Sequence, residues 1–218
     1  MFSQNGEVLV KLFDNSSILA SNLLSTKESS RYLAPTIKAQ LQKLNLSVSD
    51  LSKIVVDAGP GPFTTSRTLV VTANGLSYSS NVPIQKVNHL EALILQVKQQ
   101  FNNKELIVGV LNGFGGDIFF SVFDSEKNDF LFKDQCLFIE KFNEFAFQFF
   151  KNKQVVFLGE GSALVSSLAD SLQAKVLDKT FNEFSDEFIF DLANIVVEPV
   201  FEIFPIYIKE NFSNVLKK

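Results

Sequence analysis

The sequence is poor in the side chains from which most enzyme sites are built. Its 218 residues contain one cysteine, one histidine, one methionine and no tryptophan. A single cysteine, Cys136, excludes an internal disulfide, and Cys136 with His89 cannot supply the several ligands of an ordinary zinc site. The composition therefore predicts neither a disulfide scaffold nor a His/Cys metal centre.

Positive charge and long apolar stretches are also scarce. The formal net charge is −4, whereas a protein that grips a phosphate backbone by itself normally presents a basic face. Polar residues interrupt every apolar run well before the ~20 residues that span a membrane. The segment 1–17 has no basic region followed by an apolar run, which is the pattern of a secretory signal. We therefore expect a cytoplasmic protein without a membrane segment, which meets nucleic acid only through a partner.

The chain is rich in apolar side chains arranged in short periodic runs. Hydrophobic residues make up 46% of the sequence, and 24 residues are Phe, so the chain can bury a sizeable core. Apolar residues at period two predict strands, and apolar residues three or four apart predict helices. The expected strands are 6–13, 17–24, 53–57, 84–87, 105–111, 117–123 and 154–158, and the expected helices are 30–44, 64–80, 90–101 and 140–151.

The order of these elements predicts an α/β protein with two lobes. Strands followed by alternating strands and helices occur twice, separated by the polar residues 102–104, and such alternation is typical of α/β layers. We place the first lobe at 1–101 and the second at 102–218. We also expect the C-terminal tail to pack back on the first lobe.

No constellation of reactive side chains stands out. The base of a hydrolase would have to be His89, which falls where a strand passes into a helix and where a capping role is the ordinary explanation. The carboxylates Asp124, Glu126 and Asp129 are close in sequence, but a charged stretch between strands is typical of a solvated loop. Neither pattern predicts catalysis or a metal site.

Three glycine-rich turns resemble phosphate loops only in part. The turn 59–62 loses two N–H donors to its prolines and has no following Lys-Ser or Lys-Thr. The turn 159–161 lacks a third glycine and carries a negative side chain, and the turn 113–116 lies between two strands, where a hairpin is expected. We therefore predict no nucleotide site at any of the three.

One segment, however, resembles a family signature. Residues 57–67 read Asp-Ala-Gly-Pro-Gly-Pro-Phe-Thr-Thr-Ser-Arg, and Gly75-Leu76 and Pro83 follow. This segment resembles the GPGSFTGLR signature of the TsaB (YeaZ) family and its following helix. Weaker matches to the family fall in the right order at 27–35, 111–120, 157–161 and 205–209. The resemblance implies the two-lobed α/β fold of actin, heat-shock chaperones and sugar kinases (the ASKHA fold).

The sequence also departs from the family pattern. The family begins with a strand that ends in IDTS, and Met1 already falls at about that place, so we expect the first N-terminal strand to be missing. Several signature positions carry other residues, which argues against vestigial ligand binding. These positions are Ser29 for His, Pro62 for Ser, Thr65 and Leu69 for Gly, and Asn112 for Asp.

The resemblance implies a non-catalytic accessory subunit with no cofactor. In this family the subunit pairs with TsaD, the paralogue that transfers threonylcarbamoyl to adenosine 37 of tRNA, and TsaE joins as an ATPase. Without TsaD the same surface forms a homodimer, and tRNA is met only through the complex. Two alternatives stay open: a degenerate small-molecule kinase or ATPase of the same superfamily, and a stand-alone protease.

The pairing surface of the family uses the two helices that match 30–44 and 64–80 here. By this resemblance we expect interface residues on both helices, although each apolar one can instead face its own core. The expected interface residues are Leu33, Ile37, Arg67, Leu69, Ala73 and Leu76. A structural turn ahead of the second helix is expected at Gly59, Pro60, Gly61, Phe63 and Thr64, with Thr64 or Thr65 available as a cap and the Phe ring as an apolar anchor.

Overall fold

The computed structural model describes residues 1–101 and 104–208, which form two compact units. The first unit consists of Met1–Asn88 and Phe184–Ile206, and the second begins with His89–Glu183 and continues from Tyr207. The boundary expected at 101/102 adjoins residues outside the described part. The change of unit lies earlier, between Asn88 and His89, because the helix that follows packs on the sheet of the second unit.

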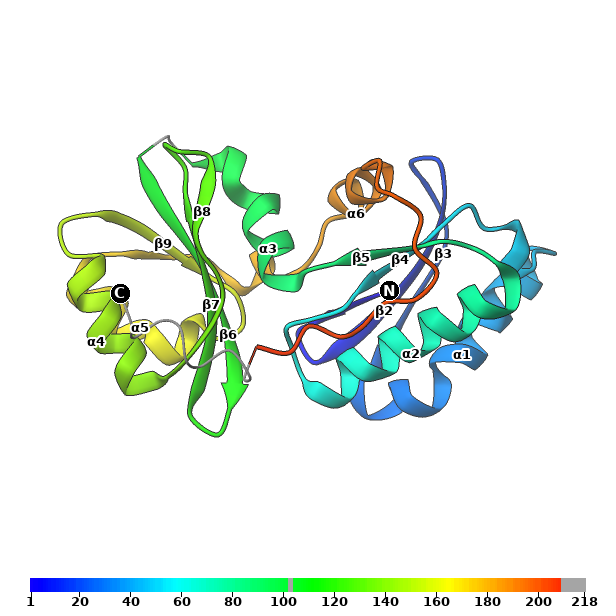
Figure 1. The fold of residues 1–218 in the computed structure, drawn as a ribbon, viewed down its shortest axis with the longest axis horizontal. Helices are drawn as coiled ribbons and strands as arrows, with labels where there is room; N and C mark the ends of the chain where they lie inside the picture. The colour runs from blue at the N-terminus through cyan, green and yellow to red at the C-terminus, as the bar shows by residue number, and fades with distance from the viewer. Residues whose placement is uncertain (102–103, 209–218) are drawn as a thin grey trace. The chain divides into compact units, whose positions relative to one another are not determined.

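The first unit contains an antiparallel sheet and a parallel strand pair (Figure 1). Strands β1 (Phe2–Gln4), β2 (Glu7–Asp14) and β3 (Ser17–Ser25) are neighbours in that order, and β4 (Ile54–Asp57) pairs with β5 (Ile84–Val87). Met1 connects the two, because its carbonyl accepts the Asp57 amide proton at 2.9 Å and its amino group donates to the Val55 carbonyl at 2.7 Å. The expectation that the first strand is missing is therefore wrong: three residues occupy its place.

Two long helices and one short helix belong to the first unit. Helix α1 (Thr26–Lys43) begins four residues before its expected start because the Ser25 side chain caps it, accepting the Glu28 amide at 3.3 Å. Helix α2 (Phe63–Ser80) and helix α6 (Asp186–Asn194) follow. Strands β2, β4 and β5 and helices α1 and α2 contribute buried side chains to one apolar core. Its members include Val8, Val10, Leu33, Ile37, Leu41, Val56, Leu69, Val70, Ala73, Ile84 and Ile203.

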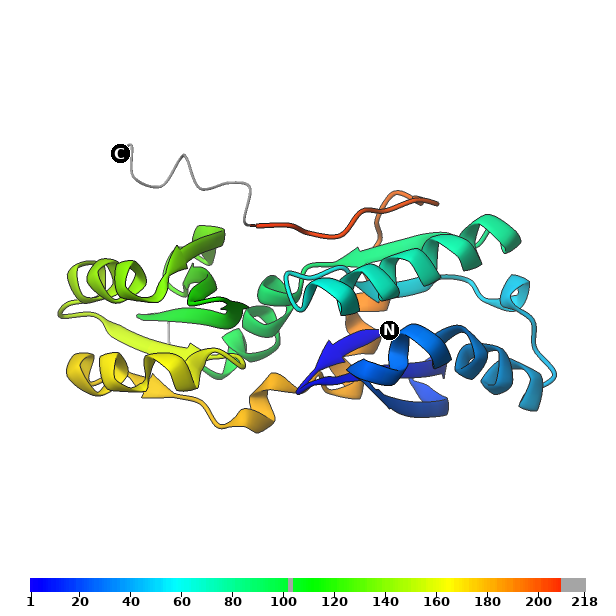
Figure 2. The ribbon, with the colours of Figure 1, turned by 90° about the horizontal axis from the view of Figure 1, so that it is seen from below.

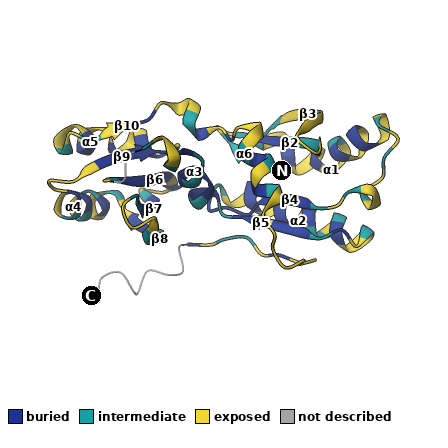
Figure 3. Cartoon of the chain, turned by 90° about the horizontal axis from the view of Figure 1, so that it is seen from above, coloured by how far each residue is buried: buried dark blue, intermediate teal, exposed yellow. Residues whose placement is uncertain are grey.

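The second unit is built on a mixed five-stranded sheet of order β10-β9-β6-β7-β8. Its strands are β6 (Glu105–Phe114), β7 (Asp117–Asp124), β8 (Asp129–Phe138), β9 (Gln154–Leu158) and β10 (Lys175–Val176), and its helices are α3 (His89–Val97), α4 (Ile139–Phe149) and α5 (Ser166–Leu172). Figure 3 shows β6 and β7 mainly in the colour of buried residues. Short 3₁₀ helices complete the structure at 48–50, 98–100, 162–165 and 179–182.

Helices cover both faces of this second sheet. Helix α3 packs where Gly109 leaves room, since a Cβ there would lie 3.2 Å from the side chains of Leu90 and Ile94. On the other face, Val108 and Val110 share a core with Phe142 of α4 and other apolar residues. Four of its fifteen buried members are Phe, and Phe132, Phe145 and Phe149 pack against it. No helix within the described residues combines the length and the apolar character that crossing a bilayer requires.

Candidate functional site

The glycine-proline turn 58–62 is a packed connection between β4 and α2. The buried Asp57 carboxylate accepts the Gly59 amide at 2.9 Å and the Ser3 amide at 3.2 Å. Gly59 has φ +93°, which favours glycine, and its bond to Pro60 is cis. The Ala58 carbonyl accepts the Ile206 amide at 2.8 Å. The amides of Ala58 and Gly59 are thus engaged within the fold, the first by the Val87 carbonyl and the second by Asp57.

The start of α2 differs from expectation at two positions. Pro62 occupies the N-cap without a side-chain capping bond, so Thr64 does not cap the helix, and its carbonyl instead accepts the Thr68 hydroxyl. Phe63 is 55% exposed and does not anchor the turn in apolar contacts. Its ring instead lies beneath the guanidinium of Arg67, 3.9 Å from the centroid. Both side chains therefore belong to the outer surface of the helix.

Most of the residues expected at an interface lie in the core of their own unit. Leu33, Ile37, Leu69 and Ala73 are between 0% and 8% exposed and contact the sheet side. Leu76 is half-buried and packs against the same core. These five positions follow the inward face of each helix, because the apolar repeat that marks a helix in a sequence is the one that the fold buries. Of the expected set, only Arg67 is exposed.

The exposed face of α2 carries a set of residues of which the sequence predicts only Arg67 as an interface residue. These residues are spaced at intervals of three or four and form one stripe along the helix, which we call the outer stripe. Its members are Phe63, Arg67, Val71, Gly75 and Tyr78. Val71 is 68% exposed and Tyr78 is 93% exposed, and Arg67 is the only charged residue in the helix. If Leu69 and Ala73 are known to face the core, the helical repeat of 3.6 residues places Val71 and Gly75 on the opposite, exposed face.

A second exposed apolar segment runs beside α2. Residues 195–206, which follow α6 and which we call the strap, lie alongside α2 in Figure 2. Asn74 fixes the strap with two bonds: its side-chain amide donates to the Ile203 carbonyl at 3.0 Å, and its side-chain oxygen accepts the Ile203 amide at 3.1 Å. The Ile84 amide donates to the Val200 carbonyl at 2.7 Å. Exposed apolar side chains of the strap include Val196, Phe201 and Phe204.

Lys53, just before β4, and Gln85 in β5 bind the end of α6, where the strap begins. The Lys53 ammonium group donates to the carbonyl of Ala193 at 2.6 Å and to the side chain of Gln85 at 2.9 Å. Gln85 in turn donates to the Leu192 carbonyl. These bonds satisfy carbonyl groups at the C-terminal end of α6, where a positive charge is also favourable to the helix dipole. The end of α6, from which the strap continues, is therefore anchored to Lys53 and Gln85.

One titratable group in the first unit has a strongly altered proton affinity. Burial lowers the pKa of the Met1 amino group from 8.0 to about 5, although the nearby Asp57 carboxylate acts in the opposite direction. The group is an internal hydrogen-bond donor to β4. Its lowered pKa therefore affects how the stability of the fold depends on pH.

The other glycine turns are also packed. The Gly159 amide donates to the Asn182 side chain at 2.9 Å, and the Gly161 amide donates to the Val110 carbonyl, also at 2.9 Å. The turn 113–116 is a hairpin between β6 and β7, and a Cβ on Gly116 would meet the ring of Phe138 at 2.5 Å. The Gly159 and Gly161 amides are therefore engaged within the fold, and Gly116 packs against Phe138.

The reactive side chains weighed above do not assemble into a site. His89 is the first residue of α3 and is 6% exposed, and Cys136 is buried in β8. Asp124 ends β7, and its carboxylate accepts the amides of Glu126 and Lys127, so it shapes a hairpin turn. Within residues 1–101 and 104–208, no three His, Cys, Asp or Glu side chains gather as metal ligands would.

Comparison with known sequences points to one family. The family model described as TsaD, tRNA N6-adenosine threonylcarbamoyltransferase, matches residues 19–190. The TsaB protein of Bacillus subtilis is 28% identical over 141 residues, which are 63% of this chain and 59% of the relative. The TsaB protein of Buchnera aphidicola (from Schizaphis graminum) is 30% identical over 84 residues, or 38% of this chain and 40% of the relative. The chain thus spans 59% and 40% of these curated relatives.

Solved structures extend the similarity to nearly the whole fold. A Pseudomonas aeruginosa protein described as similar to peptidase YEAZ superposes with a TM-score of 0.69 at 16% identity, covering 94% of this chain and 95% of that chain. YeaZ from the same organism gives a TM-score of 0.65, also at 16% identity, over 93% and 94%. The expected two-lobed α/β fold is thereby confirmed. With the family model matching well over half of its length, the chain belongs to the TsaD family of proteins and, within it, to the TsaB (YeaZ) group.

Proposed function

We propose that this chain is a non-catalytic subunit in the synthesis of N6-threonylcarbamoyladenosine in tRNA. It would act in the cytoplasm by pairing with a TsaD enzyme, with TsaE as a further member of the complex and with tRNA bound only through the assembly. The family match and the names of the TsaB relatives support the process. The packed glycine turns and the buried His89 support a role without chemistry of its own.

The observation that carries the pairing role is the outer stripe of α2. An 18-residue helix with one charged side chain and with Phe63, Val71 and Tyr78 on its exposed face leaves apolar surface in water. Such surface is typical of a site that a partner covers. Arg67 remains an interface residue in this proposal. The buried residues Leu33, Ile37, Leu69 and Ala73, together with the half-buried Leu76, hold the two helices in place beneath it.

The two alternative functions have weaker support. A kinase or ATPase would bind phosphate at glycine turns, and the amides of Gly59, Gly159 and Gly161 donate within the fold. A protease would need a base that reaches its substrate, and His89 is 6% exposed. One structural neighbour is described as similar to a peptidase, but at 16% identity the likeness concerns the fold alone.

Co-purification with the TsaD protein of the same organism tests the proposal. Val71→Arg places a charge in the middle of the outer stripe, and we expect it to abolish a one-to-one complex that the wild-type chain forms at micromolar concentration. Val176→Arg is the matched control, because Val176 is an exposed valine, 42% accessible, in β10 of the second unit. A wild-type chain that fails to bind TsaD overturns the pairing role. Equal binding by both variants overturns the choice of face.

A further inference from the structure

Most edge strands of the two units are protected against pairing with another chain. An exposed edge is a template for an added strand, so natural proteins shorten it, charge it, bend it or cover it. Strand β10 is only two residues long. Strand β8 carries the exposed Lys133, has φ +48° at Asp134 and shifts its register against β7 twice. The strap binds the edge of β5, where the Ile84 amide donates to the Val200 carbonyl.

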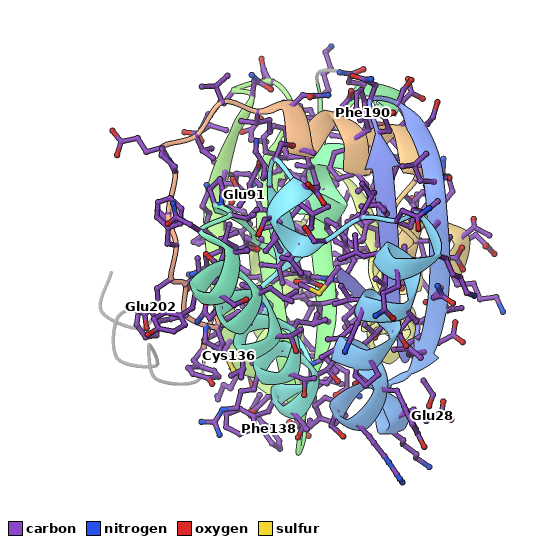
Figure 4. The ribbon with its side chains drawn as sticks, turned by 90° about the vertical axis from the view of Figure 1, so that its right-hand side faces the viewer. Glu28, Glu91, Cys136, Phe138, Phe190 and Glu202 are labelled. Atoms are coloured by element: carbon purple, nitrogen blue, oxygen red, sulfur yellow. The ribbon has the colours of Figure 1, made fainter. Side chains whose placement is uncertain are left out.

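Strand β3 lacks the charge and the cover that protect the other edges. Its nine residues, Ser17–Ser25, include no charged residue, proline or glycine. It is the outer strand of the β1-β2-β3 sheet, and no other strand of the described residues pairs with its free edge. Its one irregularity is a bulge opposite Leu12 and Phe13, which leaves 20–25 in regular register with β2. Figures 2 and 4 show β3 at the margin of the first unit that lies away from the strap.

The hydrogen-bond pattern of the hairpin shows which backbone groups of β3 point outward. The Thr26 amide donates to the Gly6 carbonyl at 3.1 Å, so these two residues form a hydrogen-bonded pair. Bonded and non-bonded pairs alternate along an antiparallel ladder. In the observed register Ser21 and Leu23 fall on non-bonded positions. Their N–H and C=O groups therefore turn away from β2, toward the free edge.

The sequence of β3 reads nearly the same in both directions. It is Ser-Ile-Leu-Ala-Ser-Asn-Leu-Leu-Ser, with Ser21 at the centre. A two-fold axis through Ser21 would place Leu19 opposite Leu23, and serine opposite serine at the centre and at both ends. Leu19 is 41% exposed and Leu23 is 49% exposed, so this contact would bury apolar surface. Contacts between identical copies require such self-complementarity, whereas strand addition by an unrelated peptide does not.

We propose that a second copy of this chain adds its β3 antiparallel to this edge, about a two-fold axis through Ser21. The Ser21 amide of each copy donates to the Ser21 carbonyl of the other, and the two three-stranded sheets join into one. No like charges meet within the paired strands, because β3 has none.

This contact does not use the surface assigned to TsaD. Hydrogen bonds of Met1 place β4 beside β1, so β3 and the strap lie at opposite ends of the row β3-β2-β1-β4-β5. Helix α2 packs on β4, β5 and β1, whereas β3 is packed by α1. The inference therefore goes beyond the proposed function and holds or fails independently of it.

Opposite charges at the axis test this arrangement. Every sample carries Val71→Arg, so that a dimer through the outer stripe is suppressed, and we expect this parent chain to dimerise. Ser21→Lys or Ser21→Glu alone brings like charges together, and we expect the dimer dissociation constant to rise at least tenfold at low salt. An equimolar mixture places Lys opposite Glu, and we expect a one-to-one heterodimer by native mass spectrometry. Ser49→Lys, at an exposed serine of the same unit, is the matched control and should dimerise like the parent.

A cysteine cross-link tests the register. Paired Ser21→Cys copies bring two thiols together at the Cα separation of roughly 5.5 Å of a bonded pair, which a disulfide can span. We expect a covalent dimer on mild oxidation of Ser21→Cys and none from Ser49→Cys, since the native Cys136 is buried.

Four outcomes overturn the inference. The first is a folded Val71→Arg chain that is monomeric at about 100 μM, and the second is a folded pair of charge variants that dimerise as well as the parent. The third is equal cross-linking of Ser21→Cys and Ser49→Cys. The fourth is loss of TsaD binding when Ser21→Lys is made in the otherwise wild-type chain, because it would assign this edge to TsaD. A dimer through β3 in a chain that never binds TsaD removes only the proposed function.

Discussion

The guanidinium of Arg67 lies 3.9 Å from the centre of the Phe63 ring, one helical turn away on the exposed side of α2. An exposed cation-π contact of this kind contributes roughly 0.5–1 kcal/mol. The contact fixes the relative positions of the Phe63 ring and the Arg67 guanidinium at the start of the outer stripe. The pair therefore links the stability of the helix start to the shape of the proposed pairing surface.

We expect Phe63→Ala to separate these two effects. The variant should lose at most about 1 kcal/mol of unfolding free energy, because the ring is largely exposed, and it should bind TsaD at least tenfold more weakly. Urea unfolding and a binding titration measure the two quantities. Thr64→Ala, at the exposed neighbouring position, is the control and should change neither by much. Unchanged TsaD affinity in Phe63→Ala would argue against a contact at this turn.

The inward and outward faces of α2 should respond oppositely to truncation. Leu69→Ala removes a fully buried side chain from the core of the first unit and should cost about 2–5 kcal/mol of unfolding free energy. Val71→Ala, two residues away on the outer stripe, should change that free energy by less than about 0.5 kcal/mol. Chemical denaturation compares them. Similar losses in the two variants would mean that Val71 is also packed.

Two glycines with positive φ should differ sharply in their tolerance of a side chain. Gly159 has φ +102°, and a Cβ there would lie 2.3 Å from the Val110 carbonyl oxygen, so we expect Gly159→Ala to cost more than about 2 kcal/mol. Gly115 has φ +70° and open space around it, so Gly115→Ala should cost only about 1–2 kcal/mol from the backbone conformation. Thermal unfolding of the two variants under the same conditions tests whether the cost of a Cβ at these positions comes mainly from steric overlap or from the backbone conformation.

Acidification should destabilise a chain that begins with the free Met1 amino group. Burial lowers the pKa of this group from 8.0 to about 5 in the folded state. Between these pH values the unfolded chain binds more protons at this group than the folded chain, so unfolding free energy rises with pH from about 5 to about 8. Urea titrations across this range provide the measurement. A flat or falling profile would show that the amino group stays charged in the fold.

The sequence predicts local structure well and the direction of side chains poorly. The hairpin of β2 and β3 and both long helices follow from apolar period and turn residues. The identity of the exposed face of α2 does not, because Leu69 and Val71 are both apolar and only the position of the sheet decides which one is buried. Arg67 was found because its charge marks an outward position in any packing.

The strap shows a second limit of inference from sequence. Asn74 and Ile203 are 129 residues apart, and two hydrogen bonds between them fix the segment beside α2. No local pattern indicates such a partner. The resemblance to a family indicates the general fold and the importance of the two helices. It does not separate the buried residues of these helices from the exposed ones, so both kinds appear in the expected interface.

The first unit is made from two separate stretches of the chain, Met1–Asn88 and Phe184–Ile206, with His89–Glu183 inserted between them. Phe184 packs on Phe2, with ring centres 5.1 Å apart, and Lys11 pairs with Asp186. During translation the segment 184–206 therefore leaves the ribosome only after all the strands of the second unit have been made. The second unit can acquire its sheet while the chain is still being synthesised, whereas the unit that carries the outer stripe completes its core, and so its binding surface, last.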